Sequence, residues 1–134
     1  MLVMPSRCFE EMVAHCRAEY PNEGCGILAG EPGMVRRVVP MRNVERSPVR
    51  FLMDPSEQLA VMKAMRREGT ELVGIFHSHV ASAAYPSRRD VELAFYPDAV
   101  YVIVSLARLE RPVARGYRIV EGRISGEPIE RGRV

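Results

Sequence analysis

The chain has no tryptophan, only three cysteines, and a single lysine, Lys63, among its 19 basic residues. The other basic residues are arginines, and they are scattered along the sequence without a run that would follow a phosphate backbone. Because the net charge is only +2, composition gives no basis for nucleic-acid binding, and we expect none. No apolar run reaches the length needed to span a bilayer, so we also expect no membrane segment.

The three cysteines, Cys8, Cys16 and Cys25, contain no Cys-x-x-Cys pair. Cys8 and Cys16 lie on one predicted helix, about 12 Å apart along its axis at 1.5 Å per residue. That separation is too large for a disulfide, so we expect reduced thiols, as in a cytoplasmic protein. Residues 1–5 are too short and uncharged to form a signal peptide, which also predicts a cytoplasmic location.

A length of 134 residues with 47% hydrophobic residues predicts one domain over residues 1–134 with one core. We expect its tail after about residue 122 to be partly flexible, because that stretch is rich in charge and glycine. The interleaving of helical and extended patterns predicts an α/β fold with a mixed central sheet flanked by helices. The expected helices cover residues 6–20, 55–68 and 87–95, and the expected strands cover 2–4 (an edge strand), 25–29, 35–39, 51–53, 72–79, 100–106 and 114–120.

Two histidines end one of these predicted strands. His77 and His79 follow an apolar run over residues 72–76, which is typical of a buried strand. Positions two apart in a strand share a face, so both imidazoles can reach one ion. Asp90 stands three residues after Ser87, and the two side chains would share one face of a helix that begins at Ser87. Two histidines and one carboxylate form a common three-ligand set for catalytic zinc, with water in the fourth position.

Each part of this pattern has a simpler interpretation when taken alone. A lone His-x-His pair is a weak indicator of metal binding, and Ser87 with Asp90 also fits a helix N-cap with its capping-box partner. The capping and functional roles are compatible, because a capping hydroxyl still has a proton to donate. The combination of a buried strand end, a loop containing Pro86 and a helix start favours function, since catalytic residues concentrate at such chain ends.

The pattern His77-x-His79-x7-Ser87-x2-Asp90 resembles the JAMM motif of the JAB1/MPN/Mov34 metalloproteases. Residues 23–30, which begin Glu-Gly-Cys-Gly-Ile-Leu, are similar to the Glu-x-Cys-Gly-Leu-Leu strand of that family. The likeness extends over most of the chain and is greatest to the small prokaryotic branch. It implies the JAMM/MPN fold, which is similar to the cytidine-deaminase-like α/β/α sandwich, and one zinc ion per chain.

The resemblance also implies roles for individual residues. His77, His79 and Asp90 would bind the zinc, which acidifies a bound water. Glu23 would be the general base, although on its own it also fits a solvated turn residue. Ser87 would donate a hydrogen bond to the oxyanion of the tetrahedral intermediate.

Two positions near the motif need separate expectations. The family usually has proline directly after the second histidine, and Val80 stands there in this chain. Because a loop proline fixes φ, its loss is expected to loosen the metal-binding loop. Cys25 is expected to be a small buried hydrophobic residue; a nucleophilic thiol is the alternative, with no nearby cation or helix N-terminus evident to activate it.

The substrate implied by the resemblance is a ubiquitin-like or sulfur-carrier protein with something attached after its C-terminal Gly-Gly. The short stretch after Asp90 has no room for the insertion that gives some relatives ubiquitin-chain specificity, which favours a small sulfur-carrier-like protein. Arg46 and Arg50, in a polar loop over residues 41–50, are expected to help hold the substrate tail; the alternative is a solvated surface loop. A homodimer is left open.

Two other function classes fit parts of the sequence. One is a non-catalytic MPN scaffold that binds a partner. The complete set of metal ligands argues against this alternative. The other is a DNA-repair-associated protein like RadC, which has a similar motif together with an upstream helix-hairpin-helix segment. Metal analysis separates the first alternative from a zinc-dependent (iso)peptidase.

Overall fold

The computed structural model describes residues 1–132, which form a sheet of eight strands and three helices. The strands are β1 (Leu2–Pro5), β2 (Cys25–Glu31), β3 (Met34–Met41), β4 (Glu71–His79), β5 (Val100–Ser105), β6 (Val113–Val120), β7 (Arg123–Glu127) and β8 (Ile129–Gly132). The helices are α1 (Ser6–Glu19), α2 (Pro55–Glu68) and α3 (Arg88–Glu92). Across the sheet the strand order is β7-β6-β5-β4-β2-β3-β1-β8.

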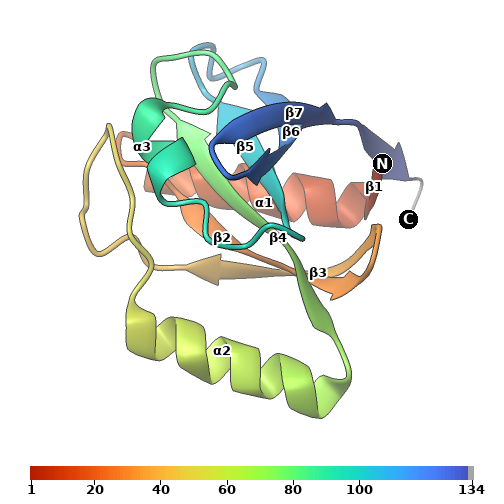
Figure 1. The fold of residues 1–134 in the computed structure, drawn as a ribbon. Helices are drawn as coiled ribbons and strands as arrows, with labels where there is room; N and C mark the ends of the chain where they lie inside the picture. Colours follow the sequence, from red (N-terminus) through yellow and green to blue (C-terminus); the bar gives the residue numbers. More distant parts are fainter. Residues whose placement is uncertain (133–134) are drawn as a thin grey trace.

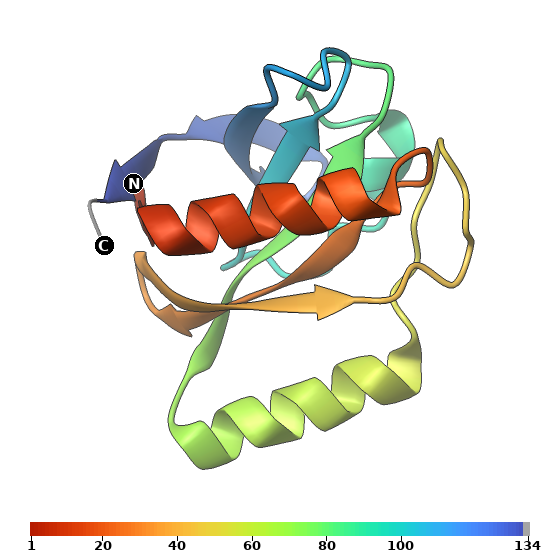
Figure 2. The ribbon, with the colours of Figure 1, turned by 180° about the vertical axis from the view of Figure 1, so that it is seen from behind.

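The sheet is mixed, as the sequence predicts. β2 pairs antiparallel with both β3 and β4, while β4 pairs parallel with β5. β5, β6 and β7 form an antiparallel meander, and β1 runs parallel to both of its neighbours, β3 and β8. Helix α1 crosses one face of the sheet, and α2 and α3 pack on the other (Figures 1 and 2). This arrangement confirms the expected α/β fold with helices on both faces.

Two apolar clusters fill the space between these layers. Under α1, the helix stripe formed by Cys8, Met12 and Cys16 packs against strand residues such as Phe76. The opposite face is covered by α2 and α3, and its core contains Cys25, Ile27, Met41, Met53, Met65, Ile75 and Tyr101. Because β4 contributes to both clusters, its side chains are buried on both faces, and its C-terminal end lies in the middle of the sheet.

Helix α2 begins and ends where its sequence signals predict. Asp54 is the N-cap, and its Oδ1 accepts hydrogen bonds from the backbone N–H groups of Ser56 at 2.9 Å and Glu57 at 3.4 Å. Pro55 occupies the first turn, where its missing N–H costs nothing. Gly69 ends the helix with a φ of 76°, in the left-handed region that favours glycine.

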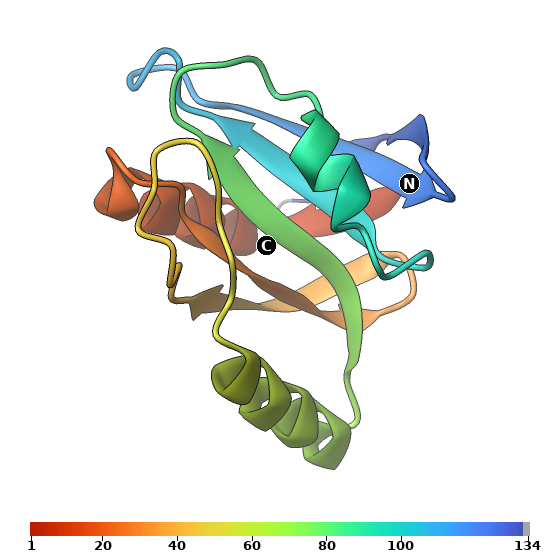
Figure 3. The ribbon, with the colours of Figure 1, turned by 60° about the vertical axis from the view of Figure 1, so that its left-hand side comes forward.

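The structure differs from the sequence predictions at four places. β1 is not an edge strand, because β8 pairs with its outer side, Leu2 with Ile129 and Pro5 with Gly132. Residues 123–132, expected in a loose tail, form β7 and β8; residues 133–134 lie outside the described part. The predicted strand over 51–53 is reduced to one bridge between Asn43 and Met53. The predicted helix over 87–95 is only the five-residue α3, which lies in front of β4 and β5 (Figure 3).

Candidate metal centre

The end of β4 brings two imidazoles together with one carboxylate. His77 and His79 lie on the same face of the strand, and their Nε2 atoms are 3.1 Å apart. Asp90 Oδ2, from α3, lies 3.1 Å from His77 Nε2 and 3.0 Å from His79 Nε2. All three side chains are buried or nearly so. The structure therefore places the three residues predicted as ligands at one point, and together they can hold a metal ion.

Asp90 is positioned by the capping box of α3. Ser87 Oγ accepts a hydrogen bond from the Asp90 backbone N–H at 3.1 Å, and the Ser87 backbone N–H donates to Asp90 Oδ2 at 2.9 Å. The capping interpretation of these two residues is thus correct. Because the hydroxyl acts as an acceptor in the cap, its own proton remains free to be donated elsewhere.

The hydrogen bonding of His79 tests whether the donor set fits a metal. His79 Nδ1 lies 2.9 Å from the Ala83 carbonyl oxygen, which can only accept, so Nδ1 carries the proton. In a neutral ring, Nε2 then directs a lone pair at Asp90 Oδ2, another acceptor. Two lone pairs 3.0 Å apart repel each other, so a cation must lie between them, either a proton that makes His79 an imidazolium or a metal ion. Ligand atoms about 2.0–2.1 Å from a tetrahedral zinc would lie roughly 3.3 Å from each other, so the observed spacing fits the ion.

The protonation states also suit metal binding. Burial lowers the pKa of His77, which keeps its ring neutral at physiological pH. Burial alone would raise the pKa of Asp90, but hydrogen bonds from His77 and His79 outweigh that effect and hold the pKa well below its usual range. Burial would lower the pKa of His79, but its contacts with Asp90 and the Ala83 carbonyl oxygen raise it, so a metal ion would displace a proton from this ring. A neutral imidazole and an ionised carboxylate are the forms that coordinate metals.

Glu23 lies two residues before the start of β2, near these ligands. Cys25 pairs with His77 across the ladder, and the Glu23 side chain is only 5% exposed. Burial raises the pKa of Glu23 to about 7, and the nearby His79 opposes that rise. A buried carboxyl group with a pKa near the working pH is suited to accept and return a proton.

The backbone around Glu23 is fixed by a buried amide that sequence reasoning missed. Asn43, 4% exposed, donates from Nδ2 to the Glu23 carbonyl oxygen at 3.0 Å and to the Arg50 carbonyl oxygen at 3.1 Å. Its Oδ1 accepts from the backbone N–H groups of Glu45 and Leu52, each at 3.0 Å. Asn43 therefore ties the segment containing Glu23 to the loop over residues 42–54. A single asparagine in a polar loop gives no sequence signal for this role.

That loop reaches the ligands through Phe51. The Phe51 ring stacks on the His77 ring, with centroids 4.5 Å apart and planes inclined by 22°. His77 Nδ1 is buried and has no hydrogen-bond partner among the described residues, so the aromatic ring is the main support on this side of the imidazole. Sequence reasoning assigned residues 51–53 to a strand and did not identify this contact.

The loop after His79 is held without the proline that the family usually has. Three successive carbonyl groups accept hydrogen bonds from side chains: Ser82 from Ser105 Oγ at 2.6 Å, Ala83 from His79 Nδ1, and Ala84 from the Tyr117 hydroxyl. Tyr85 adds an edge contact to the Tyr117 ring. These contacts hold the loop in one conformation, and the loosening expected from Val80 stays a prediction.

Other predicted residues have clear positions. All three cysteines are free and buried, and burial raises the pKa of Cys25 to about 12, so its thiol stays protonated and is no nucleophile at neutral pH.

Arg46 and Arg50 are exposed on the loop over residues 42–54, which passes beside α3 (Figure 1). Within residues 1–132 neither guanidinium is hydrogen-bonded or ion-paired to the three ligand candidates. No helix among residues 1–132 is long and apolar enough to cross a membrane.

Comparison with known proteins agrees with this geometry. The chain is 47% identical over 131 residues to the CysO-cysteine peptidase of Mycobacterium tuberculosis, covering 96% of this chain and 90% of that protein. It is 43% identical over 95 residues to a probable TtuB-protein conjugate cleaving protease of Thermus thermophilus, covering 70% of this chain and 64% of that protein. A solution structure from Desulfitobacterium hafniense superposes with a TM-score of 0.91 at 40% identity, covering 100% of this chain and 94% of the other. The family described as prokaryotic homologs of the JAB domain matches residues 5–120, and the chain belongs to this family.

Proposed function

We propose that this chain is a zinc-dependent peptidase that hydrolyses the bond after the C-terminal Gly-Gly of a ubiquitin-like or sulfur-carrier protein. The observation that carries the proposal is the convergence of His77, His79 and Asp90 beside the buried carboxyl group of Glu23. Relatives named as a peptidase and as a conjugate-cleaving protease support catalysis over the scaffold and RadC-like alternatives.

His77 Nε2, His79 Nε2 and Asp90 Oδ2 would hold one zinc ion per chain. When bound, the ion supplies Lewis-acid activation of water and of the scissile carbonyl group. Glu23 takes one proton from the attacking water. It then delivers this proton to the departing nitrogen as the C–N bond breaks. One water is consumed, and the carboxylic acid and amine formed ionise to a carboxylate and an ammonium group by transfer of the second proton of that water.

Ser87 contributes a hydrogen bond to the oxygen on which negative charge develops. Its hydroxyl oxygen is occupied by the Asp90 backbone N–H, which leaves the O–H to point toward the substrate. A donor of this kind is typically worth about 2.7–4 kcal/mol of transition-state stabilisation. The same residue thus caps α3 and assists the reaction.

The substrate class follows from the family resemblance and from the names of two relatives, a CysO-cysteine peptidase and a probable TtuB-protein conjugate cleaving protease. The loop over residues 42–54 lies against His77 through Phe51, and it offers Arg46 and Arg50 on its exposed side. These arginines hold the extended tail of the substrate as it approaches the metal centre.

The test is a fusion of a sulfur-carrier protein, ending in Gly-Gly, to one additional amino acid, incubated with the zinc-loaded protein and followed by mass spectrometry. We expect release of the added residue, and His77→Ala and Asp90→Ala should lose both zinc and activity. Elemental analysis gives the zinc content. Full zinc retention in both variants would refute the ligand assignment, and equal cleavage after Gly-Gly is changed to Ala-Ala would refute the substrate class.

A further inference from the structure

A small pocket adjoins the metal ligands on the side of α3. It is lined by Phe51, His77, Arg89, Asp90, Leu93 and Tyr101. It continues into a larger, mostly apolar pocket through Phe51, Leu93 and Tyr101, which line both. Of the six lining side chains, Arg89 is the one with a permanent positive charge.

The guanidinium of Arg89 has unused donors. Its Nε is buried and has no hydrogen-bond partner among residues 1–132. Glu45 Oε1 lies 3.8 Å from its Nη2, beyond hydrogen-bond distance, in a partly exposed pair. A buried donor without an acceptor is destabilising, so an acceptor on the substrate would gain a hydrogen bond at this place.

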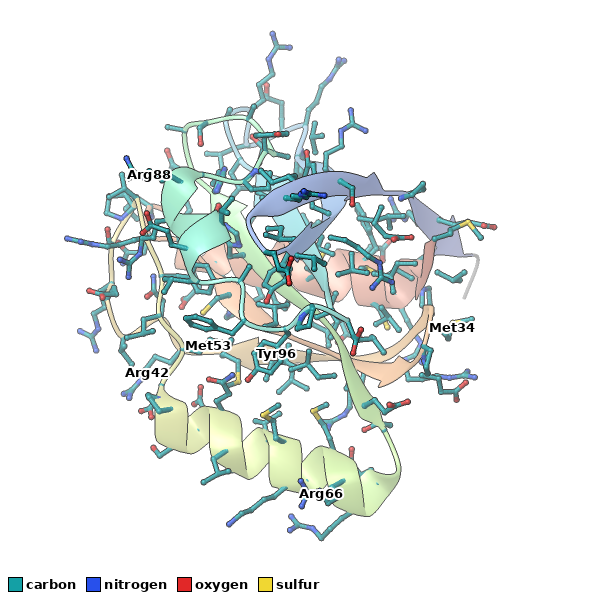
Figure 4. All side chains as sticks on the ribbon, viewed as in Figure 1. Met34, Arg42, Met53, Arg66, Arg88 and Tyr96 are labelled. Atoms are coloured by element: carbon teal, nitrogen blue, oxygen red, sulfur yellow. The ribbon has the colours of Figure 1, made fainter. Side chains whose placement is uncertain are left out.

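The neighbouring residue, Arg88, is arranged differently. Its Nε lies 3.2 Å from Glu92 Oε1, and its side chain is 94% exposed and points away from the body of the molecule (Figure 4). Arg88 and Arg89 are thus two arginines of one helix, of which only Arg89 lines the pocket.

Charge complementarity indicates what Arg89 binds. With zinc bound, its two positive charges balance the negative charges of Asp90 and ionised Glu23, so the centre has no surplus positive charge for an anionic group on the substrate. Arg89 lines the same small pocket as His77 and Asp90, which places its positive charge beside two of the proposed metal ligands. An arginine fork matches a carboxylate with two parallel hydrogen bonds.

We propose that Arg89 binds the α-carboxylate of the residue that is released, and so favours substrates in which a single amino acid follows the scissile bond. This inference rests on the proposed peptidase function. In an isopeptide substrate the departing amine is a lysine side chain of a second protein, and it has no free carboxylate at this position. Arg89 therefore does not strengthen the binding of an isopeptide substrate. The residue is therefore a determinant of exopeptidase specificity.

The experiment compares two fusions that differ only at the last group, a free carboxylate or a carboxamide after Gly-Gly-Ala. The zinc-loaded wild-type protein should prefer the free acid by roughly 10–100-fold in kcat/KM, the range of a charge-assisted hydrogen bond. Arg89→Gln should bring that ratio close to one through a higher KM for the acid, with zinc content and melting temperature kept. Arg88→Gln, the matched control, should keep the full preference.

Several results would overturn the assignment. They are a wild-type ratio near one, a loss of preference in Arg88→Gln as large as in Arg89→Gln, or an equal fall in kcat for both fusions in Arg89→Gln. The last would mean that Arg89 stabilises the oxyanion instead.

Calorimetry of alanine and alanine amide binding to the zinc-loaded protein gives a second readout. Tighter binding of alanine than of alanine amide, lost in Arg89→Gln, would support the assignment even if neither fusion is cleaved. Failure to cleave either fusion would count against the proposed peptidase function and not against the role of Arg89. Equal binding of the two compounds would overturn the assignment.

Discussion

The Phe51 ring stacks on the His77 ring at a centroid separation of 4.5 Å, which joins a loop residue to a metal-ligand candidate at the centre of the sheet. Phe51 also lines both pockets beside the centre. Its position means that the loop over residues 42–54 shapes the surroundings of His77 and the walls of both pockets.

Removing this ring should weaken zinc binding. Phe51→Ala takes away the support of a buried imidazole whose Nδ1 has no hydrogen-bond partner in the described part of the chain. We expect the zinc dissociation constant to rise by about 10-fold or more, as for other residues that orient metal ligands. Competition with a chromogenic chelator measures it. Phe95→Ala, at a phenylalanine that is 71% exposed, is the control, and equal affinities in both variants would contradict this role.

Glu23→Gln should keep zinc and lose hydrolysis, because the amide preserves shape and removes the proton acceptor. If Glu23 is the base, the rate of the wild-type protein should rise with pH as this group ionises. Rate profiles and zinc analysis on the same samples provide the check. Substantial turnover by a zinc-loaded Glu23→Gln protein would rule out the assignment.

The same carboxyl group predicts a stability effect in the metal-free protein. Its folded pKa, about 7, lies above the ordinary value of 4.5, so folding favours the protonated form. Stability is therefore full below about pH 4.5, falls as pH rises toward 7, and is lower by up to about 3 kcal/mol above it. Glu23→Gln should melt at the same temperature as wild type near pH 4 and at a higher one at pH 8. A lower melting temperature at pH 8 would contradict the raised pKa.

Ser87→Ala should have two separable effects. Loss of the N-cap of α3 should lower the free energy of unfolding by about 1 kcal/mol. Loss of the oxyanion donor should lower kcat by about 100-fold or more, since such donors are typically worth 2.7–4 kcal/mol. Denaturant titration and steady-state kinetics measure the two separately. Ser87→Thr keeps a hydroxyl, so its stability and its kcat should both lie between those of Ser87→Ala and the wild-type protein. An unchanged kcat in Ser87→Ala would exclude the catalytic role.

Asn43→Ala should destabilise the fold and disturb catalysis together. The change leaves the carbonyl groups of Glu23 and Arg50 and the N–H groups of Glu45 and Leu52 without their partner. At about 1 kcal/mol per hydrogen bond, we expect a loss of roughly 2–4 kcal/mol, measured by denaturant unfolding. Asn22→Ala, on the other side of Glu23, is the control and should cost less than 1 kcal/mol. A loss of less than 1 kcal/mol in Asn43→Ala as well would show that the loop keeps its conformation without these four hydrogen bonds.

Local patterns in the sequence predicted the parts of this fold that depend on neighbours in the chain. The alternation in β4 placed His77 and His79 on one face, and the spacing of Ser87 and Asp90 predicted a capping box. The contacts that local patterns missed join distant segments: the stacking of Phe51 on His77, the bonds of Asn43, and the pairing of β8 with β1. Strands β7 and β8 are largely exposed, so they lack the apolar alternation that makes a strand recognisable.

The pairing of β1 with β8 has a consequence for how the protein folds. Leu2 pairs with Ile129, so the first and the last described strands are neighbours in the sheet. β1 can pair with β3 while its other side stays open until β8 joins the sheet. Contacts of such large sequence separation form late in folding, because the entropy of closing the long intervening loop must be overcome first. The pairing of β1 with β8 is therefore expected to be among the last to form, and until then β1 has an unpaired strand edge.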